Sequence, residues 1–382
     1  MIVSRLILRN WRNFQAIDLA LSDRVFIVGP NAAGKSNLLD ALRFLRDVAR
    51  PGGGLQSAIR HRGGLSKIRC LAARREPNVE IEVELAESTF DGPVWRYRLS
   101  ITQEVRGRRQ PYVASESVWE KGKLVLDRPD KNDEVDFLRR TQTHLEQVNA
   151  NAKFRPITQF FESIRYLHLV PQLLRHPETV AGSVFEEDPF GRFFLETVAR
   201  TPEKTRKSRL ARIESALREA VPQLKKLTDT KDDAGVPHLE AVYEHWRPNA
   251  GRQREDQFSD GTLRLIGLFW SLLDGNSPLL LEEPELSLHS ALVAKLPSLF
   301  HQVLRSRKRQ IFATTHSWEM LSDKGIGGEE VVLLRPGSEG TQAEVASSVK
   351  EIRAMLEAGL SVADVVLPRT TPVELRQLDL FR

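Results

Sequence analysis

The sequence predicts an α/β protein with a mixed central sheet, and three observations support this fold class. The first 50 residues follow a strand–loop–helix pattern, and the last third of the chain alternates helical and strand patterns. Between Val79 and Leu126, apolar and polar residues alternate with a period of two. Alternating helices and strands favour a parallel sheet, whereas the period of two is typical of an antiparallel meander. We therefore expect both arrangements in one chain.

The opening unit consists of predicted strands followed by a helix. RLILRNWRNFQAIDLAL (5–21) alternates like two paired strands, and RVFIVG (24–29) is a short buried strand. Apolar positions at helical spacing predict a helix over SNLLDALRFLRDVAR (36–50), which PGGG (51–54) ends. The meander beside this unit is carried by NVEIEVEL, VWRYRLSITQEV and KLVLD, with turns at FDGP and EKGK.

The middle of the chain has a mixed pattern. Residues 133–161 have a more helical pattern, and IRYLHLVP (164–171) reads as a strand that ends at its proline. In the basic segment RTPEKTRKSRLARIESALREAV (200–221), the apolar residues lie on one helical face. Two strands are expected around KKLTD (225–229) and LEAVYEHW (239–246).

The last third continues the alternation. A helix is predicted over GTLRLIGLFWSLL (261–273), a strand over PLLLEE (278–283), an amphipathic helix through ALVAKLPSLFHQVL (291–304) and a strand over QIFATTH (310–316). A strand pair, VVLLRP and TQAEVAS, and a helix around VKEIRAMLEAGL follow.

Composition excludes several protein classes. Hydrophobic residues at 41% and charged residues at 28% of 382 are near globular averages, which argues against disorder or a fibrous repeat. No run approaches the ~20 apolar residues of a spanning helix, and the N-terminus lacks the apolar core of a secretory signal. The single cysteine, Cys70, excludes an intramolecular disulfide. We expect a cytoplasmic protein without a membrane partner.

GPNAAGKS, residues 29–36, matches the phosphate-binding pattern G-x-x-x-x-G-K-[ST] between a buried strand and a helix. Backbone N–H groups of such a loop point at phosphate oxygens, and the helix N-terminus adds positive potential. Lys35 would neutralise the β and γ phosphates, and Ser36 would bind Mg²⁺. The predicted nucleotide-contacting residues are Gly29, Pro30, Asn31, Ala32, Ala33, Gly34, Lys35, Ser36 and Asn37.

The acidic segment PLLLEEPELSLH (278–289) begins with a strand that contains three leucines, and carboxylates lie at the C-terminal end of this strand. Open α/β sheets bind ligands at the C-terminal ends of their strands, where these carboxylates emerge. Glu282 would hold the water shell of Mg²⁺, and Glu283 would orient or deprotonate the attacking water. EEPE alone is typical of a solvated strand end, so this interpretation depends on the phosphate loop.

These segments together resemble the ABC-type ATPases of the SMC, RecF and OLD class, members of which are often called AAA-family ATPases. The resemblance covers nearly the whole chain through RNWRNF, GPNAAGKSNLLDAL, QFSDGTLRLIGL, EEPELSLH and ATTHS in the expected order. It implies an ABC-type head with a mixed sheet, a β-meander and a helical signature lobe. In such proteins two heads sandwich two ATP molecules, each nucleotide lying between one phosphate loop and the other signature.

The resemblance also implies roles for residues outside the phosphate loop. Ser259 and Gly261 would contact the γ-phosphate in trans, as suits a hydroxyl and a helix N-terminus. His316 would sense the γ-phosphate and position the water. Gln172 would touch Mg²⁺ and the water, although a surface glutamine after a proline is the alternative. Residues 286–289 would pack across the dimer.

The sequence departs from the family pattern at two places. The first carboxylate is Glu282 where the family usually has aspartate, and Phe258 and Thr262 differ from the transporter-like LSGGQ signature. Slow hydrolysis is an expected consequence. About 220 residues without a heptad run separate loop and signature, unlike the coiled coils of SMC proteins. The 66 residues after His316 contain no clustered acidic metal site like that of the OLD nuclease domain, so we expect no nuclease activity from this chain.

Basic clusters suggest a nucleic-acid partner. They occur at IRHRGGLSKIRCLAARR, VRGRRQ, RTPEKTRKSRLAR and LRSRKRQ, and each alone is typical of a solvated face. Several clusters on an ATPase of this class favour duplex DNA, contacted through its backbone.

The C-terminal QLDLF resembles the bacterial sliding-clamp-binding motif, and a tail folded onto its own domain or another partner contact is the alternative. The predicted clamp-binding residues are Gln377, Leu378, Asp379, Leu380 and Phe381.

We expect one head made of two lobes. Residues 1–170 and 258–367 would form the nucleotide-binding core with its meander, 171–257 a helical insertion lobe, and 368–382 an exposed tail. Two functions follow. In the first, an ATPase homodimer closes and opens around ATP and Mg²⁺ to control DNA, recruited by the clamp. In the second, an ATP-loaded scaffold of an anti-phage or toxin-type system holds or senses a separate effector protein.

Overall fold

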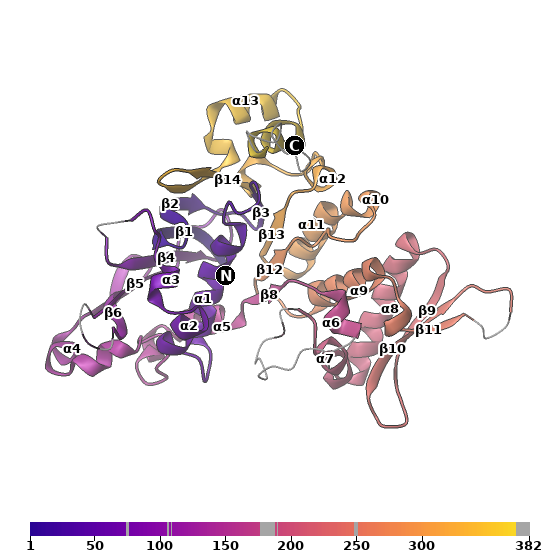
Figure 1. Ribbon diagram of the computed structural model, residues 1–382, viewed down its shortest axis with the longest axis horizontal. Coiled ribbons are helices and arrows are strands. Elements are labelled where there is room, and N and C mark those ends of the chain that lie inside the picture. The colour runs from indigo at the N-terminus through magenta and orange to yellow at the C-terminus, as the bar shows by residue number, and fades with distance from the viewer. Residues whose placement is uncertain are drawn as a thin grey trace, which may run out of the picture.

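The computed structural model describes residues 1–73, 76–104, 107, 109–175, 188, 190–247 and 251–371. Figure 1 shows an antiparallel sheet on the left, an insertion lobe on the right, and a central sheet between them. None of the described helices is both long and apolar enough to cross a bilayer.

The central sheet has the order β15-β14-β3-β13-β12-β8. Its strands are β3 (Arg24–Val28), β8 (Arg165–Leu167), β12 (Leu279–Glu282), β13 (Ile311–Thr315), β14 (Val331–Gly337) and β15 (Gly340–Val345). All neighbours are parallel except β14 and β15. The C-terminal ends of β3, β12 and β13 therefore meet at one edge, which is where the sequence predicts the phosphate site.

The second sheet is antiparallel throughout, in the order β2-β1-β4-β5-β6-β7. Its strands are β1 (Ile2–Trp11), β2 (Phe14–Ala20), β4 (Val79–Ala86), β5 (Trp95–Gln103), β6 (Pro111–Glu120) and β7 (Lys123–Arg128). The period-two segments thus form the predicted meander, and the N-terminal strand pair extends it.

Helices fill the space beside and between these sheets. They are α1 (Lys35–Ala49), α2 (Leu55–His61), α3 (Leu65–Ile68), α4 (Lys131–Val135), α5 (Arg155–Ser163), α6 (Pro171–Arg175), α7 (Phe194–Arg200), α8 (Glu203–Ala220), α9 (Asp260–Leu273), α10 (Ser290–Val293), α11 (Leu296–Arg307), α12 (Trp318–Leu321), α13 (Lys350–Glu357) and α14 (Val362–Val366). Leucines and Phe44 of α1 belong to one buried cluster with apolar residues of both sheets, so α1 joins the two sheets. Residues of α9, α11 and α14 cover the other face of the central sheet.

The insertion lobe has its own core. Apolar residues of α7 and α8 pack with those of a small sheet, in the order β11-β10-β9. Its strands are β9 (Leu224–Lys231), β10 (Pro237–Tyr243) and β11 (Arg252–Arg254). Helix α9 contributes Leu263 and Trp270 to this core and Leu268 to the central one, so this helix links the two cores.

Some elements differ from the prediction. The prediction of one amphipathic helix through residues 291–304 is wrong, because the chain forms two helices, α10 and α11, with a break at Ala294 and Lys295. Pro297 lies in the first turn of α11, where its missing N–H disrupts no helical hydrogen bond. Strand β8 is shorter than predicted, and the entirely exposed β11 has no apolar alternation that would have revealed it.

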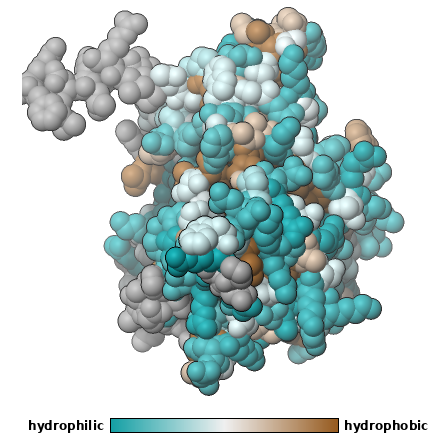
Figure 2. All heavy atoms as spheres, turned by 90° about the vertical axis from the view of Figure 1, so that its right-hand side faces the viewer, coloured by the Kyte–Doolittle hydropathy of each residue, from teal (hydrophilic) through white to brown (hydrophobic). Residues whose placement is uncertain are grey.

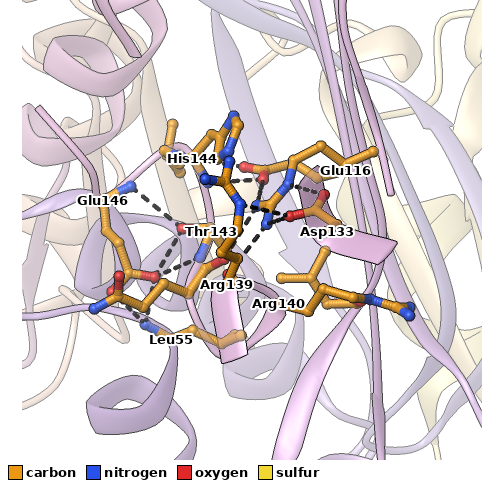
Figure 3. Close-up of polar contacts among 12 residues, drawn as sticks. Leu55, Glu116, Asp133, Arg139, Arg140, Thr143, His144 and Glu146 are labelled. Atoms are coloured by element: carbon orange, nitrogen blue, oxygen red, sulfur yellow. Dashed lines mark hydrogen bonds and ion pairs between the residues drawn. The ribbon is translucent and has the colours of Figure 1, made fainter. Parts of the chain in front are cut away.

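A buried ion cluster, formed by Glu116, Arg128 and Asp133, ties the meander to the segment that follows it (Figure 3). Arg128 Nη1 lies 3.0 Å from Glu116 Oε2, and its Nη2 lies 2.8 Å from Asp133 Oδ1. Glu116 also accepts from the backbone N–H of His144 at 2.7 Å and from the Tyr97 hydroxyl at 3.0 Å. Burial opposes ionisation of Asp133, but hydrogen bonds from Arg128 outweigh it and hold the pKa of Asp133 below its usual range.

Candidate nucleotide-binding site

The phosphate loop, residues 29–36, joins β3 to α1 and is clamped by the turn between β1 and β2. Asn13 of that turn donates to the carbonyl of Ala33 at 2.7 Å and accepts from Asn37 Nδ2 at 2.9 Å. Gly34 has φ 99°, and a Cβ there would lie 2.2 Å from Asn13 Nδ2. Only glycine fits this position without a shift of the clamp. The RNWRNF segment therefore shapes the loop.

Lys35 begins helix α1 and folds back over its own loop. Its Nζ donates to the carbonyls of Gly29 at 3.1 Å and Pro30 at 3.2 Å. Burial lowers the pKa of Lys35, and the nearby charges of Glu283, Glu282 and Glu285 oppose that effect. The lysine thus faces three carboxylates across the site, at the position where a polyphosphate would be neutralised.

Ser36 and Glu282, two of the three predicted metal ligands, are in contact. The Ser36 hydroxyl hydrogen-bonds to one oxygen of Glu282, and the Tyr166 hydroxyl of β8 hydrogen-bonds to the other. Hydroxyl, carboxylate, water and phosphate oxygens are ligands that suit magnesium, so this pair fits the ion. The glutamate side chain, which stands where the family usually has aspartate, is long enough to reach Ser36.

Glu283 comes directly after β12, in a backbone conformation uncommon for residues other than glycine. Its φ is 44°, and its N–H donates to the Thr314 hydroxyl of β13 at 3.1 Å. Its Oε1 lies 3.6 Å from Nε2 of His316. Burial, and then the charge of Lys35, lowers the pKa of His316, while Glu283 opposes this shift. The predicted base and switch histidine therefore face each other.

Glu285 anchors the acidic segment to the end of β13. Its Oε1 accepts from the Thr315 hydroxyl at 2.5 Å and from the His316 N–H at 3.2 Å. Burial raises the pKa of Glu285, while these hydrogen bonds lower it. A change at this carboxylate would move the His316 backbone, which makes Glu285 a positioning residue.

The signature residues lie at the N-terminus of α9. Ser259 caps the helix, since its Oγ accepts from the Thr262 N–H at 3.2 Å, and the residue is exposed. Gly261 packs against the segment after Glu283, because a Cβ there would lie 2.7 Å from the Ser287 carbonyl oxygen. Of the two predicted trans-acting residues, Gly261 thus lies against Ser287 and Leu288 of the same chain.

Gln172 lies away from the predicted metal ligands. Its Nε2 donates to Asp260 Oδ2 at 3.0 Å, at the start of α9, and Arg175 pairs with the same carboxylate at 2.5 Å. The structure does not bring Gln172 to Ser36 or Glu282, and its role at the metal stays a prediction.

Sequence reasoning missed several residues of the site. They are Asn13, Tyr166, Thr314 and Arg264. Three of them lie inside the segments RNWRNF, ATTHS and QFSDGTLRLIGL, but the segments alone do not indicate that these side chains reach the site. Tyr166 lies on β8, and its contact with Glu282 depends on tertiary packing. Arg264 of α9 is 7% exposed, its Nε and Nη1 have no hydrogen-bond partner among the described residues, and it faces Glu285 and Glu283. The predicted clamp-binding residues, Gln377 to Phe381, lie outside the described part of the chain.

The fold of this chain is similar to that of a solved SMC head. A solved SMC head bound to the C-winged helix domain of ScpA superposes with a TM-score of 0.54 at 14% identity, over 92% of this chain and 100% of that one. The similarity therefore concerns the fold.

Curated relatives match only a short stretch. The DNA replication and repair protein RecF of Haemophilus ducreyi is 57% identical over 44 residues, which are 11% of this chain and 12% of that protein. RecF of Proteus mirabilis is 49% identical over 46 residues, 12% of this chain and 13% of its own length.

The family model described as "AAA domain, putative AbiEii toxin, Type IV TA system" matches residues 24–322. That range includes the phosphate loop, the insertion lobe, the signature, the acidic segment and His316. With an α/β fold that matches an SMC-type head, the chain belongs to this family of P-loop ATPase domains.

Proposed function

We propose that the protein hydrolyses ATP and that two copies close head to tail around two ATP molecules. The observation that carries this proposal is the convergence of Lys35, Ser36, Glu282, Glu283 and His316 at one edge of the central sheet. These groups supply a cation for the phosphates, oxygen ligands for a metal, and a base beside a histidine.

The chain's own residues fit an in-line displacement. Glu283 would take a proton from water while the water oxygen bonds to the γ-phosphorus, and the bridging oxygen would leave with its electron pair on ADP. His316, held through its backbone by Glu285, would orient the water. Ser36 and Glu282 would hold Mg²⁺, which would neutralise charge on the phosphates.

The dimer is supported by what surrounds this site. Ser259 is exposed and its side chain is engaged only by Thr262 among the described residues, so it is free to meet a second phosphate loop. Leu286, shortly after Glu283 in the chain, is 40% exposed, and Trp318, shortly after His316, is 49% exposed. Large apolar side chains beside a polar site are suited to burial against a second copy.

We further propose that DNA is the partner this dimer controls. The RecF relatives are named for DNA replication and repair, and four basic segments of this chain provide cations for a phosphate backbone. In the same proposal the QLDLF tail binds a sliding clamp, and deletion of residues 376–382 would abolish co-purification with the clamp.

Steady-state ATP turnover with and without duplex DNA tests the catalytic part. We expect the turnover per protein chain to rise with protein concentration, because the active form is a dimer, and to rise when duplex DNA is added. In Glu283→Gln we expect the turnover per chain to fall at least about 100-fold. Lys35→Ala controls for contaminating ATPases. Turnover that is equal in wild type and Glu283→Gln would contradict the proposed base.

A second function, an ATP-loaded scaffold for a separate effector protein, is favoured by one observation. The matching family is described by a toxin–antitoxin system. Very slow turnover that DNA leaves unchanged, together with a protein that co-purifies stably, would select the scaffold over the DNA-coupled ATPase.

A further inference from the structure

The edge of the central sheet opposite the nucleotide site carries a concentration of positive charge. We call it the arginine cluster, and it consists of Arg165, Arg209, Arg212, Arg307 and Arg309. Arg165 begins β8 and Arg309 precedes β13, so both lie at N-terminal strand ends. The other members lie on α8 and at the end of α11. The fold thereby unites two basic segments, RTPEKTRKSRLAR and LRSRKRQ, that are about 100 residues apart in the sequence.

Among the charges of the described residues that act on Arg307 and Arg309, Asp274 is the single carboxylate. Asp274, the C-cap of α9, pairs with Arg165 and lies 2.9 Å from Nη1 of Arg209. Arg309 uses its Nε to donate to the Ser277 carbonyl at 2.5 Å and its Nη1 to donate to that of Ser271. Its Nη2 is buried and has no hydrogen-bond partner among the described residues. Arg165 and Arg209 therefore share Asp274 as a counter-charge, and the same carboxylate acts on Arg307 and Arg309.

Burial and electrostatic repulsion within the arginine cluster both lower the pKa values of Arg307 and Arg309. Burial, and then the charge of Arg165, lowers the pKa of Arg309 to about 10, against the attraction of Asp274. Burial, and then Arg212 and Arg209, lowers the pKa of Arg307 in the same way. An anion bound here would relieve this repulsion, because it would favour the charged form of every guanidinium.

The surface around the arginine cluster favours nucleic acid over protein. Arg165 has a side chain that is 54% exposed, and Lys204, Arg212, Arg305 and Lys308 are exposed. None of the large, exposed apolar side chains of the described residues lies within 204–212 or 304–310. The side of the molecule that carries the insertion lobe is mostly hydrophilic (Figure 2). Protein interfaces need an apolar centre, whereas DNA interfaces are polar and strongly positive.

We propose that the arginine cluster binds the phosphate backbone of duplex DNA, an inference that rests on the proposed DNA-coupled function. Guanidinium groups suit phosphate oxygens, and contacts of this kind carry no base sequence information. The cluster lies at the C-terminal end of α9, whose N-terminal end carries Ser259. The DNA site and the trans-acting signature are thus the two ends of one helix about 20 Å long.

Fluorescence anisotropy with a labelled duplex of about 30 base pairs, between about 50 and about 200 mM salt, tests this site on the full chain. The test variant is Arg212→Glu with Arg307→Glu, which spares the buried Arg309. The matched control, Lys350→Glu with Arg353→Glu, makes the same charge change on exposed residues of α13. Arg212→Gln with Arg307→Gln serves as a milder test pair that introduces no new charge.

We expect the test pair to lower DNA affinity at least about tenfold and to reduce the salt slope by about 2, and the control pair to stay within about twofold of wild type. Equal loss in both pairs, or none in the test pair, would overturn the location and leave the DNA-coupled function standing. Wild type that binds no duplex would overturn both. Polyglutamate that binds wild type better than the duplex does would identify a protein-binding surface and overturn the proposal.

Discussion

The buried ion cluster of the meander and the nucleotide site both gather charged side chains, yet they differ in how completely those side chains are hydrogen-bonded. Arg128 uses all its donors: two bonds to Asp133, one to Glu116, and two to the carbonyls of Arg139 and Gln142. In the nucleotide site, Glu285 Oε2, His316 Nε2 and two nitrogens of Arg264 have no hydrogen-bond partner among the described residues.

This difference in pairing indicates that the ion cluster stabilises the fold, whereas the nucleotide site is suited to binding a ligand. Buried polar groups are normally paired, so a fully paired cluster is complete as it stands and holds the fold. Buried groups left unpaired around a lysine and three carboxylates are ready for a ligand that supplies the missing contacts. The comparison predicts that changes in the first region lower stability and changes in the second alter nucleotide chemistry or assembly.

The largest effect is expected from Arg128→Met. Removing the arginine leaves the buried Glu116 without its counter-charge, and leaves the buried Asp133 with the partly exposed Arg139 in place of its closest cation. The free energy of unfolding should therefore fall by about 3–5 kcal/mol. Urea denaturation measures this. Arg139→Gln is the matched control, because Arg139 is 40% exposed and lies 3.3 Å from the same Asp133; about 1 kcal/mol or less is expected. Equal losses in the two variants would show that the buried pairing is not what stabilises this region.

A smaller effect is expected at Ser259, which caps helix α9 and, in the proposed dimer, contacts the γ-phosphate of the partner's ATP. Ser259→Ala removes the N-cap of α9 and should cost about 1 kcal/mol of stability. Ser259→Asp keeps an N-cap acceptor and should preserve the melting temperature, but its negative charge would repel the γ-phosphate of a partner's ATP and prevent dimerisation. Thermal melting and light scattering with ATP read the two roles. An aspartate variant that dimerises like wild type would argue against a phosphate contact.

The smallest effect concerns pH. The pKa of Asp133 is lower in the folded chain than its ordinary value of 3.8, so its contribution to stability is present above that value. The contribution is lost as pH falls through the folded pKa. Denaturation from neutral to strongly acidic pH should therefore show an acid-side loss that is reduced in Asp133→Asn. An identical acid dependence in both proteins would assign the loss to other carboxylates.

Much of the nucleotide site was predictable, because its parts are local motifs placed by a general rule. The phosphate loop and EEPELSLH each follow a strand, and the C-terminal ends of parallel strands meet at one edge. The contact between Ser36 and Glu282 follows from that rule. The alternation of strand patterns likewise predicted the meander.

The remaining features depend on tertiary contacts that no local pattern contains. Asn13 clamps the phosphate loop only because the turn between β1 and β2 lies against it. Gln172 meets Asp260 because α6 packs on α9, a pairing that the position after Pro171 did not indicate. In the sequence, the basic segments on α8 and α11 are each typical of a solvated face. The fold brings Arg209 of the first to Asp274 and Arg307 of the second to the neighbouring Gly275 carbonyl.

The mass of the Glu283→Gln chain in solution, measured by light scattering with ATP and with ADP, tests the central claim most directly. Because this variant would bind ATP without removing the γ-phosphate, we predict the dimer mass with ATP and the monomer mass with ADP. Lys35→Ala added to the same chain should restore the monomer, since the phosphates would lose their cation. A Glu283→Gln chain that stays monomeric with saturating ATP and hydrolyses it at the wild-type rate would contradict both the shared site and its base.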